Sequence, residues 1–517
     1  MRRAFLFCLL IPLYFSKAFS QIFPIQSGYN TILEQANADS SWGIHTSLKP
    51  VFDIACYSIL HNGSSAKTKM GMGRVASRLT GMHLLEFESD DVYVTLDPLL
   101  DMSLMFDSHD TSANGNLFSN WRGLRCTGRL GKQVSFQTDF VEVQTRPAEW
   151  QRQWIDSAGV YQGFGRVKPF QVDAYDFAVS SGSLQYQPWN AVILRVGSER
   201  QFIGNGYRSM LWSDAIFPTP YIQARWITPN RKWQYSSGFH LLQTLDRLPK
   251  GEVPESLFKR KGASVNYLSV KPWRGAELGL FECVIWNMYD SAGTQGPEVG
   301  AYIPLWGVNT LLYAKDTINN SVAGVNISQS LQRNFLLYGQ LVLDNISAER
   351  MGWQLGCRVF NPRCKGLNLL LEWNHSSSYL YAFESPLQSY SHTQQPLGHP
   401  AGASLDEWIL RWEYRRNRWQ GRVHVSYLEQ EMDAGAEITS LPQNAIQTFA
   451  PSPVRRLLNA SAEIAFVINS VNSLEIVTGY QFRQQRIDYN WIEDTTQLTR
   501  LLYFGLRTSI ISRYNDF

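Results

Sequence analysis

The stretch that decides the fold is Glu407-Trp408-Ile409-Leu410-Arg411-Trp412-Glu413-Tyr414-Arg415, in the last quarter of the chain. Trp408, Leu410, Trp412 and Tyr414 fall on one side of this stretch, and its four charged residues fall on the other. Alternation with a period of two is the pattern of a β-strand whose two faces meet different surroundings. The stretch therefore predicts a strand with one apolar, aromatic face and one charged face.

The same alternation recurs along the chain, in Trp419–Leu428, Leu367–Asn374, Val134–Gln144, Val192–Glu199, Leu278–Asn287, Leu336–Leu343 and from Leu474 to Arg483. A soluble sandwich or propeller would alternate core with solvent, whereas a membrane barrel alternates lipid with lumen. Trp and Tyr near the segment ends, charged opposite faces and the lack of a blade-length repeat favour the barrel. We predict an all-β fold: a transmembrane antiparallel β-barrel over residues 91–517, with a small N-terminal mixed or helical element.

The composition agrees with a membrane barrel. Of 517 residues, 44% are hydrophobic and only 18% are charged, against roughly 25% in soluble domains. Aromatic residues reach 13%, which excludes a disordered chain. After residue 21 no run of 18 apolar residues occurs, which excludes an α-helical membrane protein.

Residues 1–20 predict a cleavable signal peptide for export in a Gram-negative bacterium. Two arginines open the segment, Ala4–Phe15 is apolar, and Ala18-Phe19-Ser20 offers small residues for cleavage before Gln21. The chain has 47 Lys and Arg and 44 Asp and Glu, and the signal segment removes three basic residues and no acid. The mature chain is therefore neutral, and no nucleic-acid partner is expected.

Residues 21–90 precede the first clear strand and predict a separate N-terminal segment that is either periplasmic or plugs the barrel. A helix is predicted over Lys67–Leu85, weakened by its glycines. Asn361-Pro362-Arg363 and Asn417-Arg418 predict tight turns. Long polar loops are predicted over Asp246–Lys261, Tyr289–Glu298, Ser376–Asp406 and Glu431–Pro453, and in a bacterial barrel such loops face outside.

Cysteines and the last residue give weaker signals. The mature chain has five cysteines, and an odd count is not a disulfide framework. Cys357 and Cys364 could approach across a turn, but their spacing leaves the pairing open. Phe517 is compatible with the terminal aromatic of outer-membrane proteins, although it is out of register with the apolar face of Phe504 and Leu506.

The sequence contains no convincing catalytic constellation. It has no H-E-x-x-H, no G-x-S-x-G and no P-loop, and no pair of acids can be assigned acid and base roles. His392, His399 and Asp406 have spacings that match no known metal site. We therefore expect a non-enzymatic protein without cofactor or metal.

Two segments contain candidate ligand-binding residues. The glycine-kinked run 202–214 brings together Tyr207, Arg208, Trp212 and Asp214. These side chains suit a sugar site inside the barrel, but a structural Arg–Asp pair in a kinked strand explains them as well.

The second segment, Ser389–Ala403, carries no charge and is stiffened by two prolines. It holds Tyr390, His392 and His399, whose rings and neutral polar groups suit a hydroxyl-rich ligand. We predict that it faces outside and contacts polysaccharide.

These segments also carry a family resemblance. The chain resembles the Wzi-type capsule-assembly family of outer-membrane proteins. The most specific match is Phe202-Ile203-Gly204-Asn205-Gly206-Tyr207-Arg208-Ser209, followed by Ser213-Asp214. The same family pattern is seen in Asn120-Trp121-Arg122-Gly123, Phe140-Val141-Glu142-Val143-Gln144 and Gly163-Phe164-Gly165-Arg166. Four further stretches resemble the RemB-like branch of this family, which is associated with gliding motility. They are Leu280-Phe281-Glu282, Leu337-Tyr338-Gly339-Gln340-Leu341, Leu343-Asp344 and the run from Leu397 to Ala403. The matches span about residues 90–415, with departures at Phe118-Ser119, Trp212 and Ala401.

The resemblance implies a monomeric barrel of about 18 strands that takes part in polysaccharide display at the cell surface. The first hypothesis is a non-enzymatic outer-membrane protein that binds, assembles or anchors capsular or exopolysaccharide. Alternatives are an accessory of gliding motility or cell-surface secretion with protein partners, a diffusion porin, and a lipid-acting barrel enzyme. The expected partners are outer-membrane lipid and surface polysaccharide, with motility or secretion proteins in the alternative.

Overall fold

The structure is a computed structural model. It describes residues 33–35, 44–51, 80–110, 116–248, 258–290, 293–294, 296, 300, 303–313, 319–332, 334–361, 364–383, 385–432, 452–489, 494–508 and 514–517. The predicted signal peptide and most of the predicted helix Lys67–Leu85 lie outside these residues, and Leu85 itself begins a strand. None of the helices in the described ranges is both long enough and apolar enough to cross a membrane.

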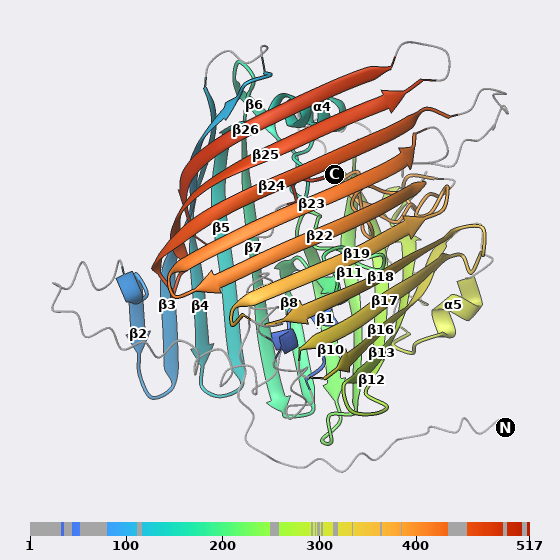
Figure 1. Cartoon of the computed structure of the whole chain (residues 1–517). Coiled ribbons are helices and arrows are strands. Elements are labelled where there is room, and N and C mark those ends of the chain that lie inside the picture. Colours follow the sequence, from blue (N-terminus) through green and yellow to red (C-terminus); the bar gives the residue numbers. More distant parts are fainter. Residues whose placement is uncertain are drawn as a thin grey trace, which may run out of the picture.

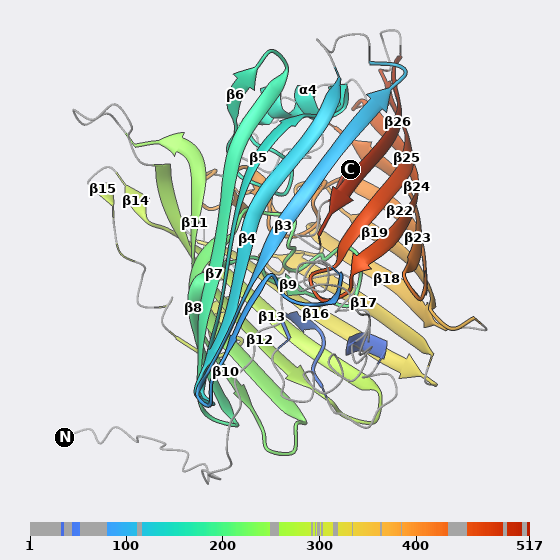
Figure 2. The same cartoon turned by 90° about the vertical axis from the view of Figure 1, so that its left-hand side faces the viewer.

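Within the described residues, eighteen antiparallel strands form a closed barrel (Figures 1 and 2). They are β3 (Val92–Asp107), β4 (Leu117–Leu130), β5 (Val134–Arg146), β7 (Ala174–Trp189), β8 (Val192–Glu199), β10 (Thr219–Ile227), β11 (Trp233–Arg247), β12 (Phe258–Val270), β13 (Ala276–Asn287), β16 (Asn320–Leu331), β17 (Phe335–Asp344), β18 (Met351–Phe360), β19 (Leu367–Ser376), β22 (Leu405–Arg416), β23 (Trp419–Glu431), β24 (Val454–Asn469), β25 (Leu474–Asp488) and β26 (Thr495–Arg507). Each strand pairs with its neighbours, and β26 pairs back with β3 to close the wall. β2 (Leu85–Glu88) pairs with β3, and β6 (Lys168–Gln171) pairs with β7.

The predicted strands are confirmed, and so is their division into two faces. In β22, Trp408 and Leu410 are 44% and 41% exposed on the outer surface, whereas Glu407 and Ile409 are buried on the inner side. Large exposed apolar side chains recur on the outer face of most barrel strands, as in Phe140 and Phe504. This apolar outer surface is what a bilayer requires of a barrel, and it makes the protein an outer-membrane β-barrel.

Aromatic side chains gather at both ends of this apolar surface. The Trp353 and Trp373 rings lie 4.3 Å apart, and the Trp373 and Trp408 rings stack at 6.1 Å, near one end of β18, β19 and β22. At the opposite end, Trp419 of β23 packs against Phe466 of β24 with ring centroids 5.0 Å apart. Indole rings favour the interface between lipid and water, so these groups mark the two edges of the membrane zone.

The two ends of the barrel differ in their connections. Short turns such as Asn417-Arg418 lie at one end, which confirms that predicted turn. The long connections, among them residues 147–173 and 377–404, start from the other end. Because the long loops of bacterial barrels face the cell exterior, we take that end as extracellular.

Inside the barrel lie four segments: residues 44–51, 200–217, 377–404 and 514–517. In them, β1 (Leu48–Lys49) pairs with β9 (Phe202–Ile203), and β20 (Ser391–His392) pairs with β21 (Gln395–Pro396). Apolar side chains of the first three segments share one core with inward-facing wall residues of β11, β12, β13, β16 and β17, whereas Tyr514 and Phe517 pack with Ala215. Both views show the C-terminal end of the chain within the barrel outline (Figures 1 and 2).

One patch of the outer wall is polar and covered. By strand alternation Glu282 of β13 points outward, opposite to the core residues Phe281 and Cys283. The Glu282 carboxylate accepts a hydrogen bond from the backbone N–H of Gly307, next to α5 (Val308–Tyr313), which Figure 1 shows outside the wall. Because an uncovered carboxylate in lipid is costly, residues 303–313 make this part of the wall compatible with the membrane.

The end of the chain and the cysteines differ from the simplest expectations. β26 ends at Arg507, and Phe517 lies inside the barrel, 5% exposed, beside Tyr514. Phe517 is therefore not an aromatic of the last strand, which agrees with its being out of register with Phe504 and Leu506. Cys357 and Cys364 are both free.

The membrane-facing assignment predicts a depth-dependent effect of charge. Leu410 lies in the middle of β22, whereas Leu130 is the last residue of β4, equally outward-facing and 45% exposed. Leu410→Arg should lower the free energy of unfolding of the protein in lipid vesicles by about 2–4 kcal/mol. Leu130→Arg should lower it by about 0–1 kcal/mol. Urea titrations followed by tryptophan fluorescence would measure both. Equal losses at the two positions would contradict the assignment.

Candidate functional site

Residues 200–217, which we call the inner hairpin, leave the wall between β8 and β10 and fold into the lumen. The backbone can do this because Gly204 has φ +142° and a Cβ there would lie 2.5 Å from Gln340 Nε2. A Cβ on Gly206 would lie 2.5 Å from Glu372 Oε2. Only glycine allows so close an approach to the wall at these two positions, which confirms the predicted glycine kink.

Arg208, at the tip of the inner hairpin, is held by carboxylates. Its Nη2 donates to Glu407 Oε1 at 2.7 Å and its Nε donates to Glu407 Oε2 at 3.1 Å, with both side chains fully buried. Asp516 Oδ2 lies 3.1 Å from the same Nη2. Although burial opposes it, the Arg208 and His424 charges hold the pKa of Asp516 below its usual value. Arg208 thus ties the inner hairpin to β22 and to residues 514–517.

A second carboxylate holds the backbone of the inner hairpin. Glu372 of β19 accepts hydrogen bonds from the backbone N–H of Tyr207 at 2.7 Å and of Arg208 at 3.0 Å. The Tyr338 hydroxyl also donates to Glu372, at 2.8 Å. Glu372 and Glu407, on adjacent strands, are joined by Asn374, which donates to both.

Residues 377–383 and 385–404, which we call the inner loop, are also packed into the lumen. Tyr390, His392 and His399 are at most 2% exposed. The Tyr390 hydroxyl donates to the backbone oxygen of Leu211, and His399 Nε2 lies 2.8 Å from Glu407 Oε2. The prediction that this loop faces outside is wrong. Its uncharged polar groups find their hydrogen-bond partners inside the protein, which composition alone does not distinguish from exposure to a sugar.

His392 and Lys261 fix the far side of the inner loop. His392 Nδ1 accepts a hydrogen bond from the backbone N–H of Gln243 in β11 at 3.1 Å. Burial lowers the pKa of His392 to about 3, so this ring is neutral at physiological pH. Lys261 of β12 donates to the backbone oxygen of Ser389 at 2.7 Å. The loop is therefore bound to the wall at both ends.

The other three candidate binding residues of the run 202–214 also lie along the inner hairpin. The Arg–Asp pair considered from the sequence does not form. Asp214 does not bind Arg208; it accepts a hydrogen bond from the Tyr514 hydroxyl at 2.5 Å, and burial raises its pKa. Tyr207 is half-buried, with the Arg208 guanidinium 4.8 Å from its ring. Trp212 is buried beside Tyr390, at 6.3 Å between ring centroids. The structure thus brings the two predicted segments into contact, but as interior packing.

A niche at the extracellular end lies beneath α4 (Glu149–Ala158), in the connection between β5 and β7. The helix ends at Gly159, which has φ +71° and donates to the backbone oxygen of Ile155. Arg152 binds Asp110 at 2.8 and 2.9 Å, and Gln153 accepts a hydrogen bond from Gln497 of β26 at 3.1 Å. These contacts fix the helix over the mouth of the barrel.

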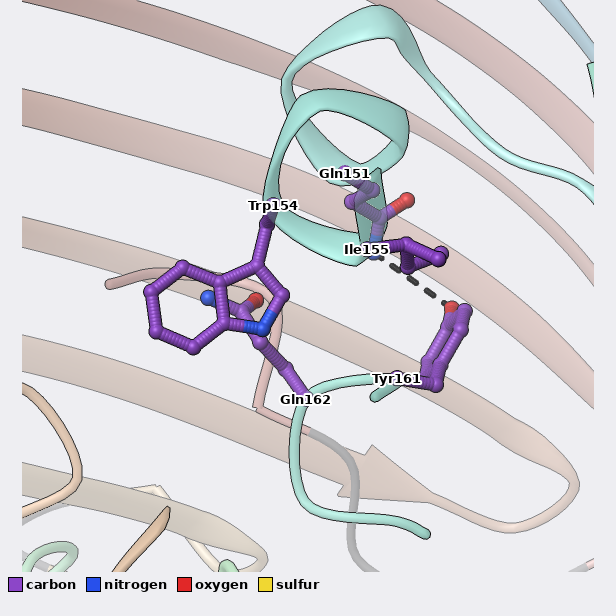
Figure 3. Close-up of a pocket in the computed structure, with 5 residues that line it drawn as sticks. All are labelled: Gln151, Trp154, Ile155, Tyr161 and Gln162. Atoms are coloured by element: carbon purple, nitrogen blue, oxygen red, sulfur yellow. Dashed lines mark hydrogen bonds between the residues drawn. The ribbon is translucent and has the colours of Figure 1, made fainter. Parts of the chain in front are cut away.

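The niche is lined by Gln151, Trp154, Ile155, Tyr161 and Gln162 (Figure 3). Gln151 donates to the Tyr161 hydroxyl at 3.4 Å, shown dashed in Figure 3, and also reaches Asn515. The side chains of the niche leave no space for a sphere the size of a water molecule, so a ligand can contact the rim of the niche but cannot enter it.

Several buried polar atoms at this niche have no hydrogen-bond partner among the residues that the structure describes. They include the indole nitrogens of Trp150 and Trp154 and the side-chain oxygen of Gln162. Trp150 and Trp154 are four residues apart and so lie on the same side of α4. An indole face, primary amides and free N–H groups are the groups that bind hydroxyl-rich ligands.

The sequence-based search missed this niche. Glu149-Trp150-Gln151-Arg152-Gln153-Trp154 carries two tryptophans at helical spacing among polar residues, and that spacing was the available signal. It also missed the inward carboxylates Glu372 and Glu407 as the partners of the inner hairpin. Both were visible as polar residues on predicted strands, but their partners lie far away in the sequence.

Fold and interior together define an outer-membrane β-barrel whose lumen holds its own chain segments. The structure is similar to that of Wzi, a carbohydrate-binding β-barrel of the outer membrane that is involved in group 1 capsule assembly in Escherichia coli. The similarity covers 94% of this chain and 98% of Wzi, with TM-score 0.56 and 12% sequence identity. Two other outer-membrane barrels are less similar. Pseudomonas aeruginosa OprD matches 80% of this chain and 94% of its own, with TM-score 0.41 and 10% identity. Acinetobacter baumannii OccAB2 matches 80% of this chain and 97% of its own, with TM-score 0.43 and 8% identity. No family model and no curated protein matches the chain. The likeness to Wzi shows a shared fold.

The clamp on the inner hairpin can be tested by removing one charge. Glu407→Gln leaves the buried Arg208 without its main partner and should lower the free energy of unfolding by on the order of 3 kcal/mol. Glu413→Gln, in a partly exposed pair with Arg411 on the same strand, should cost less than about 1 kcal/mol. Urea unfolding in lipid vesicles would measure both variants. A loss at Glu407 no larger than that at Glu413 would refute the clamp.

Proposed function

We propose that this protein is a non-enzymatic outer-membrane barrel that binds surface polysaccharide, capsular or exopolysaccharide, at its extracellular end and helps to assemble or anchor it. The observation that carries the proposal is the niche below α4, where an indole and amides with free polar atoms meet at the mouth. Wzi, which has a similar fold, is itself a carbohydrate-binding barrel in capsule assembly, and this supports the same role here.

In this proposal the residues first predicted to bind ligand have a supporting part. Arg208, Asp214, Trp212, Tyr390, His392 and His399 are buried, and Tyr207 is half-buried. They hold the inner hairpin and inner loop against the wall. A rigid interior fixes Gln162 and residues 514–517, which border the niche, and a binding site held in place loses less entropy when it binds.

The filled interior favours binding over passive diffusion. Twenty buried apolar residues from inner segments and wall form one cluster, and Arg208, Lys261 and Trp212 are among the largest fully buried side chains. A diffusion porin needs a water-filled path through these positions. The alternative of a motility or secretion accessory makes a different prediction, because its partners would be proteins.

The niche can be tested with one aromatic substitution. Trp154→Ala should weaken the binding of surface polysaccharide to the purified protein by about 3- to 10-fold, because it removes the ring face. Trp273→Ala at a periplasmic turn, where the ring is 66% exposed, is the matched control and should change nothing. In cells, the Trp154 variant and a deletion strain should release polysaccharide into the medium. A deletion strain that keeps its polysaccharide but loses surface movement or secretion would replace this proposal with the motility alternative.

Ion conduction separates the proposal from a porin. Purified protein in planar bilayers should give no steady conductance, because the inner hairpin and inner loop occupy the lumen. A stable ohmic conductance at the single-channel level in the unaltered protein would support the porin alternative instead. Glu407→Gln, which releases the hairpin clamp, is the variant in which openings should first appear.

A further inference from the structure

Basic residues are concentrated on one side of the periplasmic end of the barrel. Five short connections there, with their flanking residues 228–232, 271–275, 332–334, 361–366 and 415–418, contain ten Lys and Arg and no Asp or Glu. The whole chain has 47 Lys and Arg and 44 Asp and Glu, so this excess is local. We call the exposed bases of these connections the basic rim: Lys232, Arg274, Lys365, Arg415 and Arg416.

The five connections follow one another along the wall. They join β10 to β11, β12 to β13, β16 to β17, β18 to β19 and β22 to β23, and these ten strands are consecutive neighbours in the barrel. Adjacent connections are two strands apart, which is roughly 10 Å. Three other short connections at this end, residues 131–133, 190–191 and 470–473, contain a single base, Lys132. The basic rim is therefore a row along one side and not a ring.

Bases of this row lack acidic partners. Lys232, Lys365 and Arg416 are exposed and form no ion pair within the part of the chain that the structure describes. At the extracellular end, by contrast, an exposed base such as Arg486 binds Asp494, at 2.6 Å. A row of like charges repels itself unless an anionic partner lies against it. The arrangement thus points to a partner outside the chain.

Indole rings fix the depth of the basic rim in the membrane. Trp233, Trp273 and Trp419 lie within or beside these connections and are 44%, 66% and 58% exposed. Lys232 precedes Trp233 in the chain, and Arg416 is paired with Trp419 across β22 and β23. Because indoles favour the edge of the bilayer, the charged groups beside them lie at the depth of the lipid phosphates.

We propose that the basic rim binds anionic phospholipids of the periplasmic leaflet through their phosphate groups. Charges spread along a row suit several separate headgroups better than one compact anion. A guanidinium can hold a phosphate through two parallel hydrogen bonds, and an ammonium attracts it as a point charge. Each base near an anionic lipid surface strengthens binding by about fivefold. The rim thereby fixes one side of the barrel at the periplasmic surface of the membrane.

The test counts the phospholipids that the purified full-length protein retains in native mass spectrometry. The protein is first equilibrated in micelles with equal amounts of phosphatidylglycerol and phosphatidylcholine that have the same acyl chains. The unaltered protein should retain at least about fivefold more phosphatidylglycerol, and added salt should narrow this difference. A rim variant that combines Lys232→Gln, Lys365→Gln and Arg416→Gln should retain the two lipids about equally.

The matched control removes the same charge from the extracellular end. It combines Lys168→Gln, Arg456→Gln and Arg486→Gln, which lie on β6, β24 and β25. This control should keep the preference of the unaltered protein for phosphatidylglycerol. Different migration of boiled and unboiled samples on a denaturing gel shows that each variant is folded.

Two results would overturn the inference. One is equal retention of the two lipids by the unaltered protein, which needs no variant to be informative. The other is a preference that both triple variants lose to the same extent, because it would report net charge and not the basic rim. Polyglutamate that binds the unaltered protein but not the rim variant, with no preference between the lipids, would assign the rim to an acidic protein partner instead.

Discussion

The buried ion pair between Arg208 and Glu407 is the contact on which the barrel interior depends. A guanidinium with no solvent exposure is stable only with a counter-charge, and Glu407 supplies it from the wall through two hydrogen bonds. His399 of the inner loop binds the same carboxylate, and Asp516 binds the same guanidinium. One wall residue thereby holds three segments that are distant in the sequence. The lumen can hold its own chain only because these charges compensate one another.

The fold could be predicted because the lipid imposes a simple rule on every strand. Leu410 and Arg411 differ in polarity because one faces acyl chains and the other faces Tyr207, and that contrast is readable one residue at a time. No such rule governs the lumen. An uncharged polar loop such as Ser389–Ala403 suits an outer surface and a packed polar interior equally well. Which one it adopts depends on Lys261, Gln243 and Glu407, whose positions only the closed barrel brings together.

The candidate site was hidden for a related reason. Arg208 and Asp214 stand out in the sequence because charge among aromatics is unusual, but such prominence is also what a buried structural pair produces. The niche residues Trp154 and Gln162 are individually ordinary. Their importance comes from polar atoms that find no hydrogen-bond partner within the described part of the chain. Unsatisfied hydrogen-bonding capacity is a property of the folded structure and has no counterpart in composition or spacing.

Interior and mouth therefore divide the polar chemistry between them. Deep in the lumen, Glu372 and Glu407 hold the inner hairpin through Arg208 and its backbone, although Nη1 of Arg208 has no hydrogen-bond partner among the described residues. At the mouth, the indole nitrogens of Trp150 and Trp154 and the side-chain oxygen of Gln162 have no hydrogen-bond partner among the described residues. A barrel that bound its glycan deep inside would have to displace its own segments and break the buried pairs, at several kcal/mol each. Binding at the mouth leaves those pairs intact, so the filled lumen serves as the rigid base of the site that stands above it.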